Sequence, residues 1–284
     1  MNNNTNKSVY IRSCFIDESN QENFFGKILS VATGFFVENE NKIFLVTNRH
    51  VVTGEDNFTG KLLDKENAGK PNYLAVKFNY NVKRKNNDDT FWANPFKIPL
   101  YKENVEDKAK KIWLEHPKYK NKIDVVAIDV TEICKNSVDN LKKVGNCTYV
   151  DIPRYKDIYV KQYTPYVAEK VYVIGYPFGF TTTRKRYLAI WNSGTIASEY
   201  EENLYVPIDK IGKTNDNTFE APTFLIDAKT RSGQSGSPVI TLKRDDENEE
   251  TILLGIYSGR VSENSDLGYV WKTELIYEII SGQF

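Results

Sequence analysis

Short segments rich in β-branched and aromatic residues recur along the chain, and polar or glycine-containing turns separate them. Many short strands at this spacing, with few helices, are typical of an all-β barrel or sandwich. The pattern predicts strands at residues 9–15, 28–37, 42–47, 73–80, 91–100, 111–115, 123–130, 170–174, 187–191, 194–198, 203–208, 223–227, 238–242, 251–257 and 268–272. We therefore expect an all-β fold.

Two segments depart from this strand pattern. Residues 131–144 mix polar and apolar side chains and predict a short helix. Near the C-terminus, Thr273 can cap a helix and Gly282 can end one. Four apolar residues between them fall on one helical face: Leu275, Ile276, Ile279 and Ile280. We expect a short amphipathic helix there.

Polar stretches separate the predicted strands. Residues 54–72 contain several glycines and a proline and are expected to form a loop. Residues 81–90 are charged and are expected to be a solvated turn, whereas residues 103–110 could form a helical turn. Residues 151–167 are interpreted as the crossing between two halves of the protein.

The formal charge of the 284-residue chain balances, with 38 Lys+Arg residues against 38 Asp+Glu residues. Binders of nucleic acids or of anionic membranes are normally basic, so both roles are disfavoured. No apolar stretch approaches the roughly 20 residues of a transmembrane helix. The composition favours a folded, soluble domain without nucleic-acid or membrane partners.

The cysteines are odd in number, and no pair of Cys14, Cys134 and Cys147 has the spacing of a metal site. The first seven residues lack the apolar run of a signal peptide. We therefore expect a cytoplasmic protein with free thiols, in which Cys147 belongs to the core.

A glycine-rich turn at residues 230–240 carries three serines and leads into an apolar strand. Gly233 and Gly236 permit backbone angles that a side chain would forbid. A serine between them, Ser235, can be held with its hydroxyl exposed and the neighbouring N–H groups free. An acyl-transfer nucleophile needs that geometry. The alternative is an ordinary glycine–serine loop.

Histidine chemistry is limited to His50 and His116, the two histidines of the chain. His50 lies just beyond a predicted buried strand, whereas His116 precedes a proline and is expected in a surface turn. Asp124 opens a later apolar strand, and Asp129 at its other end is a rival. With Ser235, the order is His, Asp, Ser, which is the order in chymotrypsin.

Five segments resemble segments of chymotrypsin-like serine proteases, in particular the bacterial trypsin-like peptidases. They contain the histidine, the aspartate, the serine, a Gly-Tyr-Pro-Phe-Gly turn and a cleft strand, at residues 46–52, 124–128, 233–238, 173–179 and 253–259. The resemblance implies two antiparallel six-stranded β-barrels, at residues 1–155 and 156–284, with a cleft between them and a short C-terminal helix.

The resemblance also implies roles for individual residues. Ser235 would be the nucleophile, His50 the general base, and Asp124 the group that orients the imidazole. The backbone N–H groups of Gly233 and Ser235 would form the oxyanion hole. Ser258 matches a serine that often bonds the aspartate of the triad.

The same resemblance places a substrate-binding strand at Tyr257, Ser258, Gly259 and Arg260, where peptide backbone would pair. It implies hydrolysis of protein or peptide substrates with no metal or organic cofactor.

Three features depart from the family pattern. Gln234 stands where digestive members have an aspartate that receives a newly cut N-terminus, so we expect activity that is constitutive or controlled by a regulatory protein partner. Lys229, Thr230 and Arg260 occupy specificity-pocket positions, and a cationic pocket would favour acidic residues, or show no such preference if these side chains point outward. The long interval between the histidine and the aspartate implies inserted loops within residues 54–115.

Other interpretations stay open at this point. The fold could be a catalytically silent protein-binding module, or an esterase or other acyl hydrolase with the same mechanism. Ser232 and Ser237 could be nucleophiles only if the turn were shifted, and both are expected to bond backbone groups instead.

Overall fold

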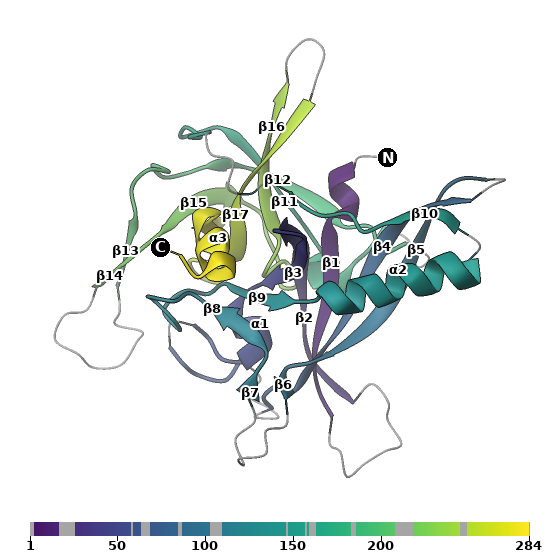
Figure 1. The fold of residues 1–284 in the computed structure, drawn as a ribbon. Helices are drawn as coiled ribbons and strands as arrows, with labels where there is room; N and C mark the ends of the chain where they lie inside the picture. The colour runs from purple at the N-terminus through teal and green to yellow at the C-terminus, as the bar shows by residue number, and fades with distance from the viewer. Residues whose placement is uncertain are drawn as a thin grey trace.

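A computed structural model describes residues 3–16, 26–57, 59–63, 69–84, 87–102, 110–145, 147–156, 158, 163–182, 186–207, 218–244 and 249–283. Two β-rich halves lie side by side, with helix α2 against the first and helix α3 near their junction (Figure 1). The predicted all-β class is confirmed. No helix in these ranges is both long and apolar enough to span a membrane.

The first half is an antiparallel sheet of eight strands, in the order β10-β4-β1-β2-β3-β9-β8, with β5 beside β4. Its strands are β1 (Ser8–Phe15), β2 (Lys27–Asn39), β3 (Lys42–Thr47), β4 (Tyr73–Arg84), β5 (Asn87–Pro99), β8 (Trp113–Glu115), β9 (Val126–Asp129) and β10 (Cys147–Asp151). The short elements η1 (Asn3–Asn6), α1 (Arg49–Thr53), β6 (Tyr101–Lys102) and β7 (Lys110–Lys111) accompany them. The sheet has eight strands where six were expected and is open in this order, but with the closed barrel of the second half it is consistent with the predicted two-barrel fold.

The difference comes from a long hairpin. Strands β4 and β5 pair through most of residues 81–90, so the turn predicted for that stretch is wrong. Tyr80 and Val82 are buried on the core face, so the alternation of β4 continues up to the charged residues Lys83 and Arg84. Most of the predicted helical turn at 103–110 lies outside the described residues.

The second half is a closed barrel in the order β11-β12-β15-β18-β17-β16, as predicted. Its strands are β11 (Lys170–Gly175), β12 (Ile190–Ile196), β15 (Thr223–Ala228), β16 (Pro238–Arg244), β17 (Glu249–Arg260) and β18 (Leu267–Lys272). The strand predicted at 203–208 is present as β13 (Leu204–Pro207), and it pairs with β14 (Thr218–Ala221), which the sequence did not predict. Strand β12 replaces the two strands expected at 187–191 and 194–198.

Both predicted helices are present, as α2 (Thr131–Gly145) and α3 (Glu274–Ser281). Gly282 ends α3 in the left-handed region at φ 72°, as expected. Thr273, however, already has helical angles, and its hydroxyl donates to the Leu253 carbonyl at 2.8 Å instead of capping the helix. The strand that precedes α3 therefore runs directly into it.

A hydrophobic cluster crosses the junction between the two halves. Phe35 and Val46 of the first sheet pack with Ile174 and Trp271 of the barrel and with Leu275 of α3. Full burial of one such side chain contributes about 1.5–3 kcal/mol relative to exposure. This shared core sets the position of each half against the other, and the candidate site lies where they meet.

Candidate active site

His50 and Asp124 are brought together by the pairing of β3 with β9. Thr47 at the end of β3 lies opposite Val126 at the start of β9, so the residues beyond these ends share one edge of the sheet. His50 lies in the one-turn helix α1, which follows β3. Asp124 lies two residues before β9, and not at the start of the strand as predicted. Its backbone carbonyl is therefore free to accept the Asn48 side-chain amide at 2.7 Å.

The Asp124 carboxylate is buried, with 1% of the residue exposed, and it accepts three hydrogen bonds. His50 contributes two donors: its backbone N–H reaches Oδ1 at 2.9 Å, and its Nδ1 lies 2.7 Å from Oδ2. The Ser258 hydroxyl of β17 donates to Oδ2 at 2.5 Å, which is the contact expected for this serine. A buried charge needs such partners, and these come from both halves of the protein.

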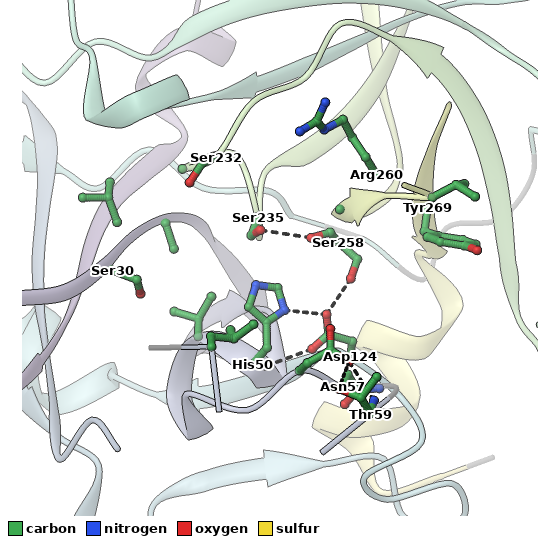
Figure 2. A pocket seen from close by; sticks show the side chains of 18 residues that line it. Ser30, His50, Asn57, Thr59, Asp124, Ser232, Ser235, Ser258, Arg260 and Tyr269 are labelled. Atoms are coloured by element: carbon green, nitrogen blue, oxygen red, sulfur yellow. Dashed lines mark hydrogen bonds and ion pairs between the residues drawn. The ribbon is translucent and has the colours of Figure 1, made fainter. Parts of the chain in front are cut away.

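The imidazole of His50 is polarised by this carboxylate. Burial lowers the pKa of His50, but the charge of Asp124 and the hydrogen bond to it more than offset that effect, so the pKa is raised above its ordinary value. Asp56 adds a smaller effect in the same direction. With Nδ1 donating to Asp124, Nε2 of the neutral ring is an acceptor. Figure 2 shows the ring lying between Asp124 and Ser235.

Ser235 lies on the turn between β15 and β16, and two glycines shape that turn. Gly233 has φ 94° and Gly236 has φ 85°. A Cβ would lie 2.3 Å from the Tyr176 carbonyl oxygen at Gly233 and 2.0 Å from the Thr33 carbonyl oxygen at Gly236. Both positions therefore exclude any side chain, and the turn can press against the first sheet.

Thr33 of β2 anchors the turn from the opposite side. Its N–H donates to the Ser235 carbonyl at 2.8 Å, and its hydroxyl donates to the Gly233 carbonyl at 2.8 Å. The sequence analysis did not single out Thr33, because its partners lie about two hundred positions away. These contacts hold Ser235 at the junction of the halves.

The Ser235 hydroxyl donates to the Ser258 carbonyl at 3.0 Å. The hydrogen bonds of the described residues include none between Ser235 and His50, although both side chains line one cavity. The hydroxyl must leave the Ser258 carbonyl before it can donate to Nε2. Catalytic hydrogen bonds are often long or misaligned before substrate binds.

Two backbone N–H groups beside Ser235 are available to a ligand. The Ser232 carbonyl accepts from Phe178 N at 2.6 Å, and the peptide bond that follows is trans. The Gly233 N–H therefore points away from Phe178. In the described part of the chain, neither the Gly233 N–H nor the Ser235 N–H donates to a protein acceptor. These are the two donors expected for an oxyanion hole.

Gln234 is fully buried and neutral. Its Oε1 accepts from Arg231 N at 2.8 Å, and its Nε2 donates to Asn192 Oδ1 at 3.0 Å. Both ends of the amide are thus paired with groups of the protein. These two hydrogen bonds tie Gln234 to Arg231 and to Asn192 of β12.

A cavity of about 850 Å³ lies between the two halves. His50, Asp124, Ser235 and Ser258 line it, and Arg260 lies at the opposite wall (Figure 2). A loop after α1 contributes Asp56, Asn57, Thr59 and Leu63. A peptide segment can enter this space. No group of three His, Cys, Asp or Glu side chains in the described ranges is arranged to hold a metal ion.

The residues predicted to form the specificity pocket differ in whether they line the cavity. Lys229 is exposed and does not line the cavity, which corrects the prediction that it lies at the pocket base. Residues alternate after β15, so Ala228 and Thr230 point inward and Lys229 points outward. Thr230 and Tyr257 are buried, and their side-chain hydroxyl oxygens are hydrogen-bonded at 2.5 Å. Arg260 lines the cavity, as Ser258 and Gly259 do, and its guanidinium donates to the Glu263 carbonyl.

His116 is not a surface residue, contrary to the prediction. It is 1% exposed, and its Nε2 lies 2.7 Å from Glu278 Oε2 of α3. Its Nδ1 accepts the backbone N–H groups of Lys118 and Tyr119 at 3.1 Å each. The turn around Pro117 was read correctly, but the helix that covers it left no local signal.

The remaining candidates are also placed. Asp129 accepts from the N–H and hydroxyl of Thr131 at the start of α2, and so it is a capping residue. Ser232 lines the cavity, whereas Ser237 is fully buried. Cys147 is half-buried against the first core.

No protein-family model matches the chain, and no curated protein is significantly similar to it in sequence. Among solved structures, the Rv3671c protease from M. tuberculosis in its active form is similar over 98% of this chain and 81% of its own, at 15% identity and TM-score 0.49. A serine endoprotease from Yersinia pestis is similar over 99% and 63%, at 14% identity and TM-score 0.47. The HtrA-type protease AlgW with a decapeptide is similar over 98% and 64%, at 13% identity and TM-score 0.43.

Proposed function

We propose that the protein is a serine endopeptidase that hydrolyses peptide bonds through an acyl-enzyme. The observation that carries the proposal is one cavity that contains a buried carboxylate–imidazole pair, a serine on a glycine turn and two free backbone N–H groups. This donor and acceptor set is what acyl transfer requires. The proposal rests on this geometry and not on the likeness to solved structures.

In the first half of the proposed reaction, Ser235 Oγ attacks the carbonyl carbon of the substrate and His50 Nε2 takes its proton. The N–H groups of Gly233 and Ser235 bind the oxyanion, and each such donor lowers the barrier by about 3–4 kcal/mol. Asp124 holds the imidazole orientation and stabilises the imidazolium. The carbon–nitrogen bond then breaks, and the leaving amine takes the proton from Nε2.

In the second half, water attacks the ester carbonyl of the acyl-enzyme while His50 accepts a proton from it. Collapse of this intermediate releases the carboxylic acid, and the proton returns to Ser235 Oγ. The charges balance at every step with the groups already present, and the residues named require no metal or organic cofactor.

The edge of β17 supports a peptide substrate over a simple ester. Strand β16 begins at Pro238, opposite Ile256, so residues 258–260 have no strand partner on that side. A bulge between Tyr257 and Gly259 also leaves Ser258 out of the pairing with β18. An extended peptide can add to such an edge through its backbone. The proposed binding segment is therefore Ser258, Gly259 and Arg260, beside Ser235.

The buried amide of Gln234 supports activity that does not wait for an N-terminal ammonium group. The first described residues are also held on the barrel, where Asn4 Nδ2 donates to Thr251 Oγ1 at 2.7 Å and Trp191 Nε1 donates to Thr5 Oγ1 at 2.9 Å. Regulation by a protein partner and a cytoplasmic location stay predictions from the sequence.

The second candidate is a catalytically silent binding module. The hydrogen bond from Ser235 to the Ser258 carbonyl favours it, because the hydroxyl is not directed to His50. Labelling by a fluorophosphonate separates the two candidates. We expect covalent labelling of the wild type at Ser235 and none of Ser235→Ala, and a folded wild type that resists labelling would support the silent module.

A second assay separates a peptidase from an esterase. Casein fragments or a peptide library would be incubated with the wild type and with Ser235→Ala, and the new peptide termini identified by mass spectrometry. Cuts that need Ser235 support the endopeptidase. Turnover of p-nitrophenyl acetate with no peptide cleavage would point to an acyl hydrolase of another class.

A further inference from the structure

The ring of Tyr257 is buried in the core of the barrel, next to residues that line the cavity. A Cβ added to Gly268 on the neighbouring strand would lie 2.5 Å from Tyr257 Cε2 and 3.3 Å from its hydroxyl oxygen. The ring therefore occupies the space that the missing side chain of Gly268 leaves. Its hydroxyl meets Thr230 Oγ1 at 2.5 Å, and both residues are almost fully buried.

This hydroxyl pair joins two segments that border the cavity. Ser232 and Gly233, just after Thr230, line the cavity, and so do Ser258 and Gly259, just after Tyr257. Thr230 and Tyr257 themselves do not line it. The open space therefore stops above the ring.

The mouth of the space is open by contrast. A Cβ at Gly259 would meet no atom within 4 Å. Tyr257, however, packs in the barrel core with Val173, Phe224 and Val239. Entry of a long side chain would require the ring to leave this core and would break a buried hydroxyl pair, whose groups would then lose their partners. The restriction thus lies at the floor and not at the rim.

We propose that Tyr257 is a specificity-determining residue that closes the primary side-chain pocket, so that the substrate residue whose carbonyl is attacked has a short side chain. The inference rests on the proposed peptidase function. Glycine, alanine and serine fit above the ring. Phenylalanine, lysine and arginine are too long. Because Arg260 lines the cavity, an acidic side chain is still compatible with the site, and the ring limits it to the short aspartate.

The test uses three covalent probes of Ser235 in the 284-residue chain. Two are peptidyl diphenyl phosphonates that differ only in an alanine or a phenylalanine side chain beside phosphorus. The third is diisopropyl fluorophosphate, which places no amino-acid side chain in the pocket. Rates of labelling at Ser235 are measured for the wild type, Tyr257→Phe and Tyr257→Ala, with thermal unfolding as a check on folding.

We expect the wild type to react at least about 10-fold faster with the alanine probe, within the range that a closed apolar pocket can discriminate. Tyr257→Phe keeps the ring and should keep the preference, whereas Tyr257→Ala should lose or reverse it. If Tyr257→Ala does not fold, Tyr257→Leu provides a smaller opening, and the wild-type ratio tests the proposal by itself.

Two negative results have different meanings. Labelling by the fluorophosphate with equal or faster reaction of the phenylalanine probe in the wild type would overturn the closed pocket and leave the peptidase proposal intact. A folded wild type that reacts with none of the three probes would overturn the peptidase proposal, and this inference with it.

Discussion

The two histidines of the protein have the same kind of partner and different surroundings. His50 Nδ1 lies 2.7 Å from Asp124, and His116 Nε2 lies 2.7 Å from Glu278. In His116 the second nitrogen accepts two backbone N–H groups, and the side chain is fully buried. In His50 the second nitrogen has no partner in the described structure, and 17% of the side chain is exposed at the cavity.

This difference shows that a carboxylate partner does not make a histidine a base. Both nitrogens of the His116 ring are hydrogen-bonded, so the ring has a structural role and connects its turn to α3. The His50 ring keeps one lone pair available beside Ser235, which is the property that proton transfer requires. The state of the second nitrogen separates the structural pair from the proposed catalytic pair.

The largest effect is expected from removing the base. His50→Ala should lower kcat for peptide cleavage on the order of 10⁶-fold, because the serine then has no proton acceptor. His116→Phe should keep most of the activity when the protein is folded. Single-turnover assays on both variants measure the contrast, and equal losses in the two would contradict the assignment of His50.

Asp124→Asn should have the next largest effect. The asparagine keeps the shape of the side chain but can hold the imidazole in the wrong tautomer, and kcat should fall ~10⁴-fold. Circular dichroism and thermal unfolding would check that the fold persists. A loss below about tenfold would mean that the carboxylate has no part in orienting His50.

The pH dependence follows from the raised pKa of His50. Hydrolysis needs the neutral ring, so kcat/KM should fall about tenfold per pH unit below that pKa, and the midpoint should lie above the ordinary value of about 6.5. A raised pKa also stabilises the fold at pH values below about 6.5, and this stabilisation is lost as the pH rises through the raised value. In the folded Asp124→Asn variant, the midpoint should shift down.

Substitutions in the His116–Glu278 pair should have the smallest effect on activity and a clear effect on stability. His116→Phe leaves the N–H groups of Lys118 and Tyr119 without their acceptor, which should lower the free energy of unfolding by about 1–3 kcal/mol. Glu278→Gln keeps an acceptor for Nε2 and should cost less. Urea unfolding measures both, and a stable His116→Phe would contradict the structural role.

Much of this arrangement could be predicted from the sequence, because its signals are local. The glycine pair around Ser235, the apolar strand before His50 and the order of the three residues are all visible in short segments. The extension of β4 and β5 into residues 81–90 was missed, because charged residues there obscured the alternation of Tyr80 and Val82. Lys229 was misplaced because motif position does not reveal which way a side chain points.

Local chemistry alone determined the all-β class, the C-terminal helix and the need for glycine at residues 233 and 236, because strand propensity, helical periodicity and positive φ depend on neighbours in the chain. Only the tertiary structure decided that His116 is buried beside Glu278, that Lys229 faces solvent and that Tyr257 is buried in the barrel core. These outcomes depend on partners brought together by folding, such as Glu278, which is 162 positions from His116. No local pattern carries that information.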